Sequence, residues 1–143
     1  MKFHPDGTLP GDEGTIFVFG SNLAGRHGRG AAEIARARFG AVTGIGGGAM
    51  GECYAIPTKG LDLRRSLGIT QIMAHVTTFL SYARAHPQLE FFVTRIGCGL
   101  AGYDDEDIAP MFRDAPPNCS FAEPWRRILE RENDGRKETG TRR

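Results

Sequence analysis

Two glycine-rich segments, residues 19–32 and 94–103, contain most of the residues whose types and spacing suggest chemistry in this sequence. Each follows an apolar run and precedes a pattern typical of a helix. Glycine lets backbone N–H groups face outward, and the start of a helix carries a partial positive charge that attracts phosphate. Two such junctions in one small chain predict a site that wraps phosphates and a nucleotide.

The first segment contains Gly25-Arg-His-Gly-Arg-Gly30. It matches neither the GxGxxG pattern of dinucleotide-binding folds nor the GxxxxGK[ST] pattern of a P-loop. Its two arginines and its histidine add hydrogen-bond donors that could contact phosphate. The alternative is a tight turn between a strand and a helix, in which glycine serves packing alone. Both interpretations stay open at this point.

Three further residues have a chemical and a structural interpretation. Cys98 lies near an expected helix start, where a thiolate is favoured, but no histidine is placed by sequence to activate it, so a buried structural thiol is preferred. Arg95 follows an expected strand and could either contact phosphate or pair with an acid. Trp125 is expected to pack the C-terminal segment onto the domain, with partner binding as the alternative.

Length and composition indicate one domain, residues 1–131, followed by residues 132–143, which lack apolar side chains and are expected to be disordered. A net charge of +1 gives no argument for binding nucleic acid or a membrane. No apolar run approaches the roughly 20 residues that span a bilayer. The three cysteines are widely spaced, which favours reduced thiols, a cytoplasmic location and no metal site. No cofactor is expected.

The expected elements alternate between strands and helices after an extended lead-in over residues 1–13. Strands are predicted at 15–19, 53–56, 89–94 and 118–121, and helices at 30–39, 69–85 and 104–112. Pro57 is expected to end the second strand. In the long helix, the stripe expected to face the core consists of Ile69, Ile72, Met73, Val76, Leu80 and Ala83.

This order predicts an α/β fold, a single three-layer α/β/α domain with a mostly parallel mixed sheet. Ligands of such sheets bind beyond the carboxyl ends of the strands. Both glycine-rich segments emerge at that edge.

Four motifs in this order carry a resemblance to a known family: Gly28-Arg-Gly-Ala-Ala32, Phe39-Gly40, Tyr54-Ala-Ile-Pro-Thr-Lys59 and Arg95-Ile-Gly-Cys-Gly-Leu100. Over about residues 15–121 the chain resembles the macrodomain superfamily, which binds ADP-ribose. It is most similar to the branch that removes ADP-ribose from protein glutamate or DNA bases, and it also resembles small macro-like proteins of phages and bacteria. The run around Cys98 is the most specific part of this resemblance.

The resemblance implies a macro-like domain that binds ADP-ribose, or a related NAD-derived nucleotide, as a free small molecule or on an ADP-ribosylated macromolecule. The first loop would border the distal ribose and diphosphate, and the second would close over the diphosphate. Phe19, Phe121 or Tyr103 could form an adenine slot. The implied ligand-binding residues are Gly20, Ser21, Asn22, Gly25, His27, Gly28, Gly30, Ala31, Thr58, Arg95, Gly97, Cys98, Gly99, Leu100, Ala101, Gly102 and Tyr103.

The sequence departs from the hydrolytic branch at its catalytic positions. Ala101 occupies the place of that branch's aspartate, and residues 44–52 lack its lysine. Alanine cannot act as an acid, base or nucleophile. Substitute catalytic candidates are Asp104, Asp105 and Lys59, for which a helix cap or a solvated strand end is the alternative.

Three functions follow from these observations. The first is binding of an ADP-ribose-like nucleotide. The second is hydrolysis of ADP-ribosyl conjugates or ADP-ribose derivatives by substituted catalytic residues. The third is a non-enzymatic phage or bacterial interaction protein, against which the intact glycine loops count.

Overall fold

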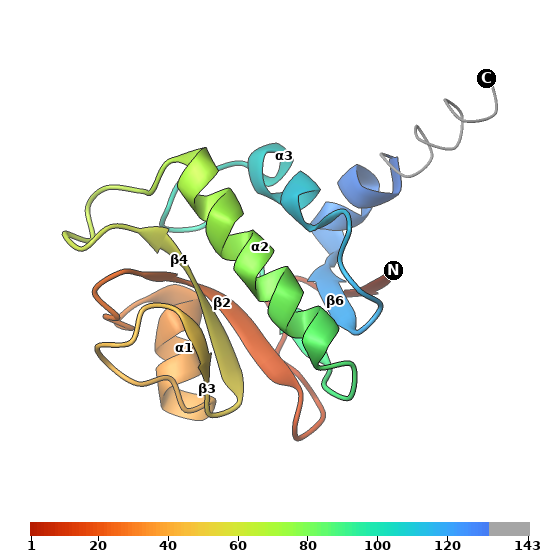
Figure 1. The fold of residues 1–143 in the computed structure, drawn as a ribbon, viewed down its shortest axis with the longest axis horizontal. Helices are drawn as coiled ribbons and strands as arrows, with labels where there is room; N and C mark the ends of the chain where they lie inside the picture. The colour runs from red at the N-terminus through yellow and green to blue at the C-terminus, as the bar shows by residue number, and fades with distance from the viewer. Residues whose placement is uncertain (132–143) are drawn as a thin grey trace.

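The computed structural model describes residues 1–131, which form a six-stranded sheet between two layers of helices (Figure 1). The strand order is β1-β6-β5-β2-β4-β3, and every neighbouring pair is parallel except β3 with β4. The strands are β1 Lys2–His4, β2 Ile16–Asn22, β3 Gly48–Met50, β4 Cys53–Lys59, β5 Phe91–Val93 and β6 Cys119–Ala122. The predicted α/β fold with a mostly parallel mixed sheet is thus confirmed.

Helix α1 (Gly30–Arg38) covers one face of the sheet, and the longer α2 (Ile69–Ala85) covers the other (Figure 1). The face of the sheet that α2 covers also carries α3 (Asp105–Ile108), which continues as the 3₁₀ helix η1 (Ala109–Phe112). A second 3₁₀ helix, η2 (Glu123–Trp125), precedes helical residues 126–131. The tail predicted at 132–143 lies outside the described residues. Within the described part, no helix is both long and apolar enough to cross a membrane.

The central strand β2 supplies both hydrophobic cores because its apolar run has no polar alternation. Phe17 and Phe19 pack in the core under α1, whereas Val18 packs in the core under α2. A strand buried on both faces needs this composition. Its carboxyl end therefore lies at the centre of the sheet edge, with α1 starting close by after a short loop.

Two short edge strands and the extent of β4 differ from the sequence predictions. The lead-in contains β1, which pairs with β6, and the glycine-rich loop before β4 contains β3. Pro57 was expected to end its strand but lies inside β4. Because β3 pairs only with Cys53–Ala55, Pro57 has no partner in β3, and proline is tolerated at such an edge.

The side of α2 that packs on the sheet is also rotated relative to the stripe of apolar residues predicted from the sequence. Phe79 is fully buried, whereas Ile69 and Met73 are 40% and 48% exposed. The large ring of Phe79 packs edge-on against Tyr54 and Phe91, so the helix turns this side toward the sheet.

Candidate functional site

A cleft of about 880 Å³ opens at the carboxyl ends of the parallel strands, between the two glycine-rich loops. The first loop joins β2 to α1, and the second joins β5 to α3. The residues that sequence analysis singled out and that line this cleft are Gly20, Ser21, Asn22, Gly28, Gly30, Ala31, Thr58, Lys59, Arg95, Gly97, Gly99, Leu100 and Ala101. Two loops far apart in the sequence thus meet around one space.

The remaining residues of the predicted set do not line the cleft; they are Gly25, His27, Cys98, Gly102, Tyr103, Asp104 and Asp105. Most of them instead make contacts that hold the loops in place. The Tyr103 hydroxyl, for instance, donates to the Leu67 carbonyl at 2.6 Å. The Asp104 backbone N–H donates to the Asp107 carboxylate at 3.1 Å, which fixes the start of α3.

Gly25 and His27 attach the first loop to the segment before β3. Gly25 has φ +69°, and a Cβ there would lie 2.3 Å from the Ile45 nitrogen, so only glycine fits. His27 is 2% exposed, and its Nε2 lies 3.1 Å from the carbonyl oxygens of both Val42 and Ile45. The packing interpretation of the first loop therefore accounts for these two residues, while Gly28 and Gly30 face the cleft.

Arg95 lines the cleft and is held by two carboxylates. Asp105 accepts from Nε at 3.0 Å and from Nη2 at 2.8 Å, and Asp6 accepts from Nη1 at 3.1 Å. The indole Nε1 of Trp125 donates to the same Asp105 at 2.7 Å. This network joins the N-terminal segment, the second glycine loop and the C-terminal segment into one support for the cleft wall.

The electrostatics of this network fix the protonation of its members. Burial alone would raise the pKa of Asp105, but hydrogen bonds from Arg95 and Trp125, with the charge of Arg95, hold it below its ordinary value. Hydrogen bonding to Asp105 raises the pKa of Arg95. Burial, aided by the charge of Asp105, raises the pKa of the Cys98 thiol to about 12, which disfavours the thiolate that a nucleophile needs.

Trp125 is fully buried and packs against the rings of Phe112 and Phe121. The interpretation that it fastens the C-terminal segment to the domain is therefore confirmed. The alternative of partner binding through Trp125 is wrong, because its ring has no accessible surface.

One end of the cleft is apolar, and much of it comes from residues that the sequence analysis did not select. Leu9, Phe17, Ile34 and Phe92 line this end, together with Ala122. None of the three aromatic residues predicted to hold an adenine, Phe19, Phe121 and Tyr103, lines the cleft. His4 stacks on Phe92 with ring centroids 3.6 Å apart.

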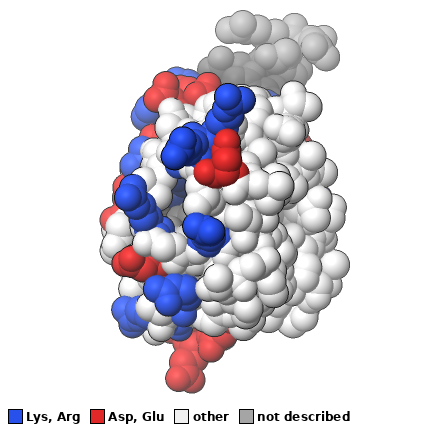
Figure 2. All heavy atoms as spheres, turned by 90° about the vertical axis from the view of Figure 1, so that its left-hand side faces the viewer, with Lys and Arg blue, Asp and Glu red and all other residues white. Residues whose placement is uncertain are grey.

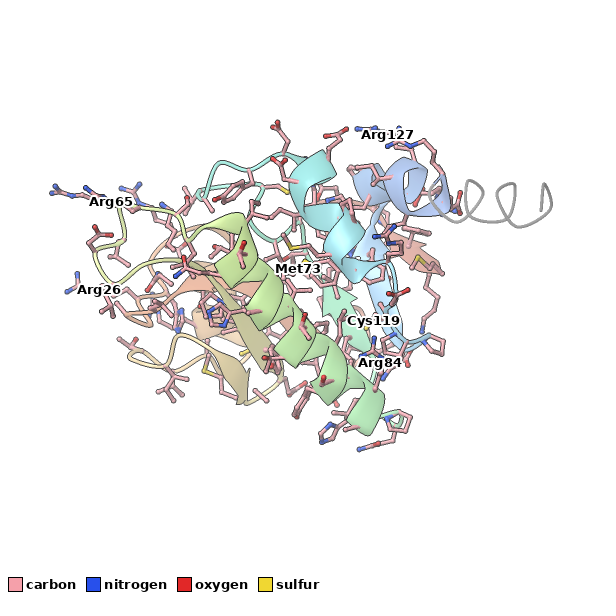
Figure 3. All side chains as sticks on the ribbon, turned by 45° about the horizontal axis from the view of Figure 1, so that its top comes forward. Arg26, Arg65, Met73, Arg84, Cys119 and Arg127 are labelled. Carbon is pink, nitrogen blue, oxygen red and sulfur yellow. The ribbon has the colours of Figure 1, made fainter. Side chains whose placement is uncertain are left out.

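The other end of the cleft is basic. Arg26, Arg29 and Lys59 line it, and Lys59 Nζ donates to the Leu63 carbonyl at 3.2 Å. Lys and Arg side chains gather on this face of the molecule (Figure 2). Arg26 and Arg65 reach out at the same end, from the loops that follow β2 and β4 (Figure 3). An anionic group at this end would be attracted by several positive charges.

Bare glycine backbone also lines the cleft. An added Cβ would meet no heavy atom within 4 Å at Gly28 or Gly99, so these glycines leave open space rather than filling it with packing. The first turn of α1 receives no side-chain cap from Arg29, which leaves backbone N–H groups of the helix start available. Within residues 1–131, no group of three His, Cys, Asp or Glu side chains is placed to hold a metal ion.

Comparison with solved structures identifies the fold. The chain is similar to the macrodomain of Mycobacterium tuberculosis DarG, with a TM-score of 0.63 and 22% sequence identity, over 85% of this chain and 95% of that one. No family model and no curated protein matches the sequence. The six-stranded sheet between two helical layers is therefore the macrodomain fold.

Proposed function

We propose that this protein binds ADP-ribose, or a related nucleotide that contains a diphosphate, in the cleft between the two glycine loops. One observation carries the proposal: a single cleft is lined by apolar side chains, bare glycine backbone and basic side chains together. A nucleotide with a flat base and an anionic diphosphate needs these kinds of surface. The macrodomain fold of the similar structure supports the same assignment.

The base would lie at the apolar end against Leu9, Ile34 and Phe92, where a flat ring replaces water against aromatic and aliphatic carbon. The Asp6 carboxylate lies beside this end and accepts from Arg95, and it can accept a further hydrogen bond from an exocyclic amine. The N-terminal segment would thus contribute to selecting the base.

The diphosphate would lie against the glycine backbone at the start of α1. A phosphate there meets outward N–H groups and the positive end of a nine-residue helix dipole. Binding through backbone groups costs little side-chain entropy, because the loops are already held in place by His27 and by the Arg95 network.

Calorimetric titration with ADP-ribose tests the proposal. We expect saturable heat with a dissociation constant on the order of 1–100 μM, about −8 to −5 kcal/mol. AMP and ribose 5-phosphate, which each carry only part of the ligand, should bind at least about tenfold more weakly, a difference of about 1.4 kcal/mol. Folded protein that releases no heat at millimolar ADP-ribose would contradict the proposal.

Lys59 is the one predicted catalytic candidate that lines the cleft, and we assign it to phosphate binding. Lys59→Gln should weaken ADP-ribose binding about tenfold at low salt, since a charge-assisted contact is worth about 1–2 kcal/mol. Lys2→Gln removes a lysine at the opposite edge of the sheet and serves as the matched control. Equal affinities of the two variants would contradict the assignment.

Hydrolysis has less support in the geometry than binding. The two other catalytic candidates, Asp104 and Asp105, do not line the cleft, and Asp105 is occupied by Arg95 and Trp125. We therefore propose ligand binding without a catalytic role for these two carboxylates. A turnover assay on an ADP-ribosylated peptide, with Asp104→Ala and Asp105→Ala compared with the native chain, tests this assignment.

A further inference from the structure

The chain that follows β4 turns back on itself beside the basic end of the cleft. We call residues 59–66 the rim hairpin, because its first and last residues form an antiparallel bridge. The Gly60 backbone N–H also donates to the Arg65 carbonyl at 2.9 Å. The hairpin extends away from the sheet on the left of Figure 1. Leu61 is 73% exposed, more than any other large apolar side chain in residues 1–131, so the hairpin is open to contact from outside the domain.

The base of the rim hairpin is fastened to the second glycine loop. The Ser66 hydroxyl donates to the carbonyl of Ala101, which lines the cleft. The next residue, Leu67, accepts from the Tyr103 hydroxyl at 2.6 Å. These two hydrogen bonds hold the hairpin in a defined position relative to the cleft.

Leu63 has a strained backbone within the rim hairpin. Its φ is +65°, and every other residue with positive φ in residues 1–131 is a glycine. Strain of this kind persists where the surrounding structure imposes it, and it occurs most often at functional sites. Leu63 lines the cleft, and its carbonyl accepts from Lys59 Nζ at 3.2 Å. The strained residue thus joins the hairpin to the cleft.

The arginines around this end of the cleft have no acidic partner. Among the described residues, Arg64 and Arg65 of the hairpin form no ion pair, and neither do Arg26 and Arg29 of the first glycine loop. Asp62 lies in the hairpin, but its carboxylate accepts from the backbone N–H groups of Arg64 and Arg65, at 3.2 Å each. The cations that do pair with carboxylates elsewhere are Lys2, Arg95, Arg126 and Arg127.

These unpaired arginines share one side of the molecule. Arg26 and Arg65 extend from it together in Figure 3, and Figure 2 shows the Lys and Arg side chains gathered there. Guanidinium groups without a partner attract carboxylates or phosphates. The rim of the cleft therefore suits a ligand with several negative charges beyond those that the cleft itself encloses.

The strand order shows which part of a nucleotide would approach the rim hairpin. Strands β1, β6 and β5 lie on one side of β2, and β4 lies on the other. The apolar residues His4, Phe92 and Ala122 come from the first side, the glycine loops follow β5 and β2, and the hairpin follows β4. With its base at the apolar end and its diphosphate at the glycine loops, ADP-ribose would direct its second sugar toward the hairpin.

We propose that the rim hairpin binds an acidic peptide to which ADP-ribose is attached, so that the ligand of this protein is a protein conjugate. This inference rests on the proposed function, because the nucleotide in the cleft places the attached chain at the hairpin. Arg64 and Arg65 would pair with Asp and Glu side chains of the peptide, since a guanidinium matches a carboxylate through two parallel hydrogen bonds. Leu61 would contact its aliphatic side chains.

An acidic peptide fits this surface better than a nucleic acid does. Proteins that bind single strands stack the bases on exposed aromatic side chains. None of the exposed large apolar side chains in residues 1–131 is aromatic. The rim offers Leu61 and Leu100 instead, which are 73% and 59% exposed. Guanidinium groups beside aliphatic carbon match a chain of mixed acidic and aliphatic residues.

Calorimetric titration of the full chain with three ligands tests the inference. They are free ADP-ribose, an ADP-ribosylated peptide rich in Asp and Glu, and the same conjugate with Asn and Gln in their place. At about 50 mM salt, the acidic conjugate should bind about tenfold more tightly than free ADP-ribose, and at about 500 mM most of this gain should vanish because exposed charges are screened. The neutral conjugate should bind like free ADP-ribose.

Replacing both Arg64 and Arg65 by glutamine should remove the gain of the acidic conjugate. Neither residue lines the cleft, so the affinity for free ADP-ribose should stay within about twofold of the native value. The matched control is Arg38→Gln with Arg84→Gln, which removes the same charge from the last turns of α1 and α2, at the opposite edge of the sheet. This control should keep the gain, and thermal melts verify that both variants fold.

The possible failures are distinguishable from one another. Equal affinities of the acidic and neutral conjugates would overturn the inference, although binding of free ADP-ribose would still support the proposed function. A single-stranded oligonucleotide conjugate that binds more tightly than the acidic peptide conjugate would assign the rim to nucleic acid and also overturn it. Native protein that binds neither free ADP-ribose nor the conjugates would contradict the proposed function and this inference together.

Discussion

Replacing Gly99 by leucine should abolish nucleotide binding while leaving the fold intact. Gly99 lines the cleft, its φ lies outside the left-handed region, and an added Cβ would meet no heavy atom within 4 Å. The leucine side chain would therefore fit without strain and occupy the space where a diphosphate is proposed to lie. We expect at least about a hundredfold loss of ADP-ribose affinity, equivalent to about 2.8 kcal/mol, with little change in melting temperature.

The control for this experiment is another glycine in open space. Gly11 also has no heavy atom within 4 Å of an added Cβ, but it does not line the cleft. Gly11→Leu should bind ADP-ribose with native affinity in the same calorimetric titration. Native affinity in Gly99→Leu would show that the ligand does not use this cleft, and the proposed function would then be wrong.

Asp105→Ala should destabilise the protein by about 2 kcal/mol at neutral pH. The Asp105 side chain is 12% exposed, and its loss leaves the Trp125 indole N–H without an acceptor and Arg95 with Asp6 alone. Breaking a fully buried pair costs about 3–5 kcal/mol, and the 35% exposure of Arg95 reduces the expected value. Urea unfolding monitored by tryptophan fluorescence measures the difference.

The same contribution should depend on pH in a defined direction. The pKa of Asp105 in the folded protein lies below its ordinary value of 3.8. As the pH falls, the Asp105 carboxylate is therefore protonated in the unfolded chain before it is protonated in the folded protein. The stabilisation is therefore complete above about pH 5 and decreases below about pH 4. Native protein and Asp105→Ala should differ less at pH 3 than at pH 7.

Glu106→Ala is a suitable comparison because it removes a neighbouring carboxylate whose ion pair with Arg127 is exposed. Exposed ion pairs contribute little to stability, so this variant should unfold close to the native chain. Equal destabilisation by Asp105→Ala and Glu106→Ala would contradict the supporting role assigned to Asp105.

The alternation of elements and the position of both glycine loops could be predicted from the sequence. The uninterrupted apolar run of β2 requires burial on both faces, and the glycines that follow it mark the strand end. The sequence allows Arg95 either to contact phosphate or to pair with an acid, and it does not identify which acid would be the partner. Asp105 and Asp6 lie 10 and 89 residues away, and only the fold brings both to the guanidinium.

The N-terminal segment is the main part of the cleft that the sequence does not predict. His4, Asp6 and Leu9 line it, although the lead-in of which they are part has no periodic pattern. Their position depends on β1 pairing with β6, which joins residues more than a hundred positions apart. Local propensity carries no information on such a pairing, because its stabilisation comes from hydrogen bonds and packing that exist only in the folded sheet.

By itself, the sequence determined which backbone segments carry no side chains. These are the glycines at the ends of two buried strands, whose effect on the backbone depends on local geometry alone. Tertiary structure decided which of those glycines face the cleft, since Gly25 packs on the segment before β3 while Gly28 and Gly99 face open space. It also supplied the apolar end, whose residues come from β2, α1, β5, β6 and the lead-in. The physical reason is that a cleft is a relation between surfaces distant in the chain, which packing of the whole domain fixes.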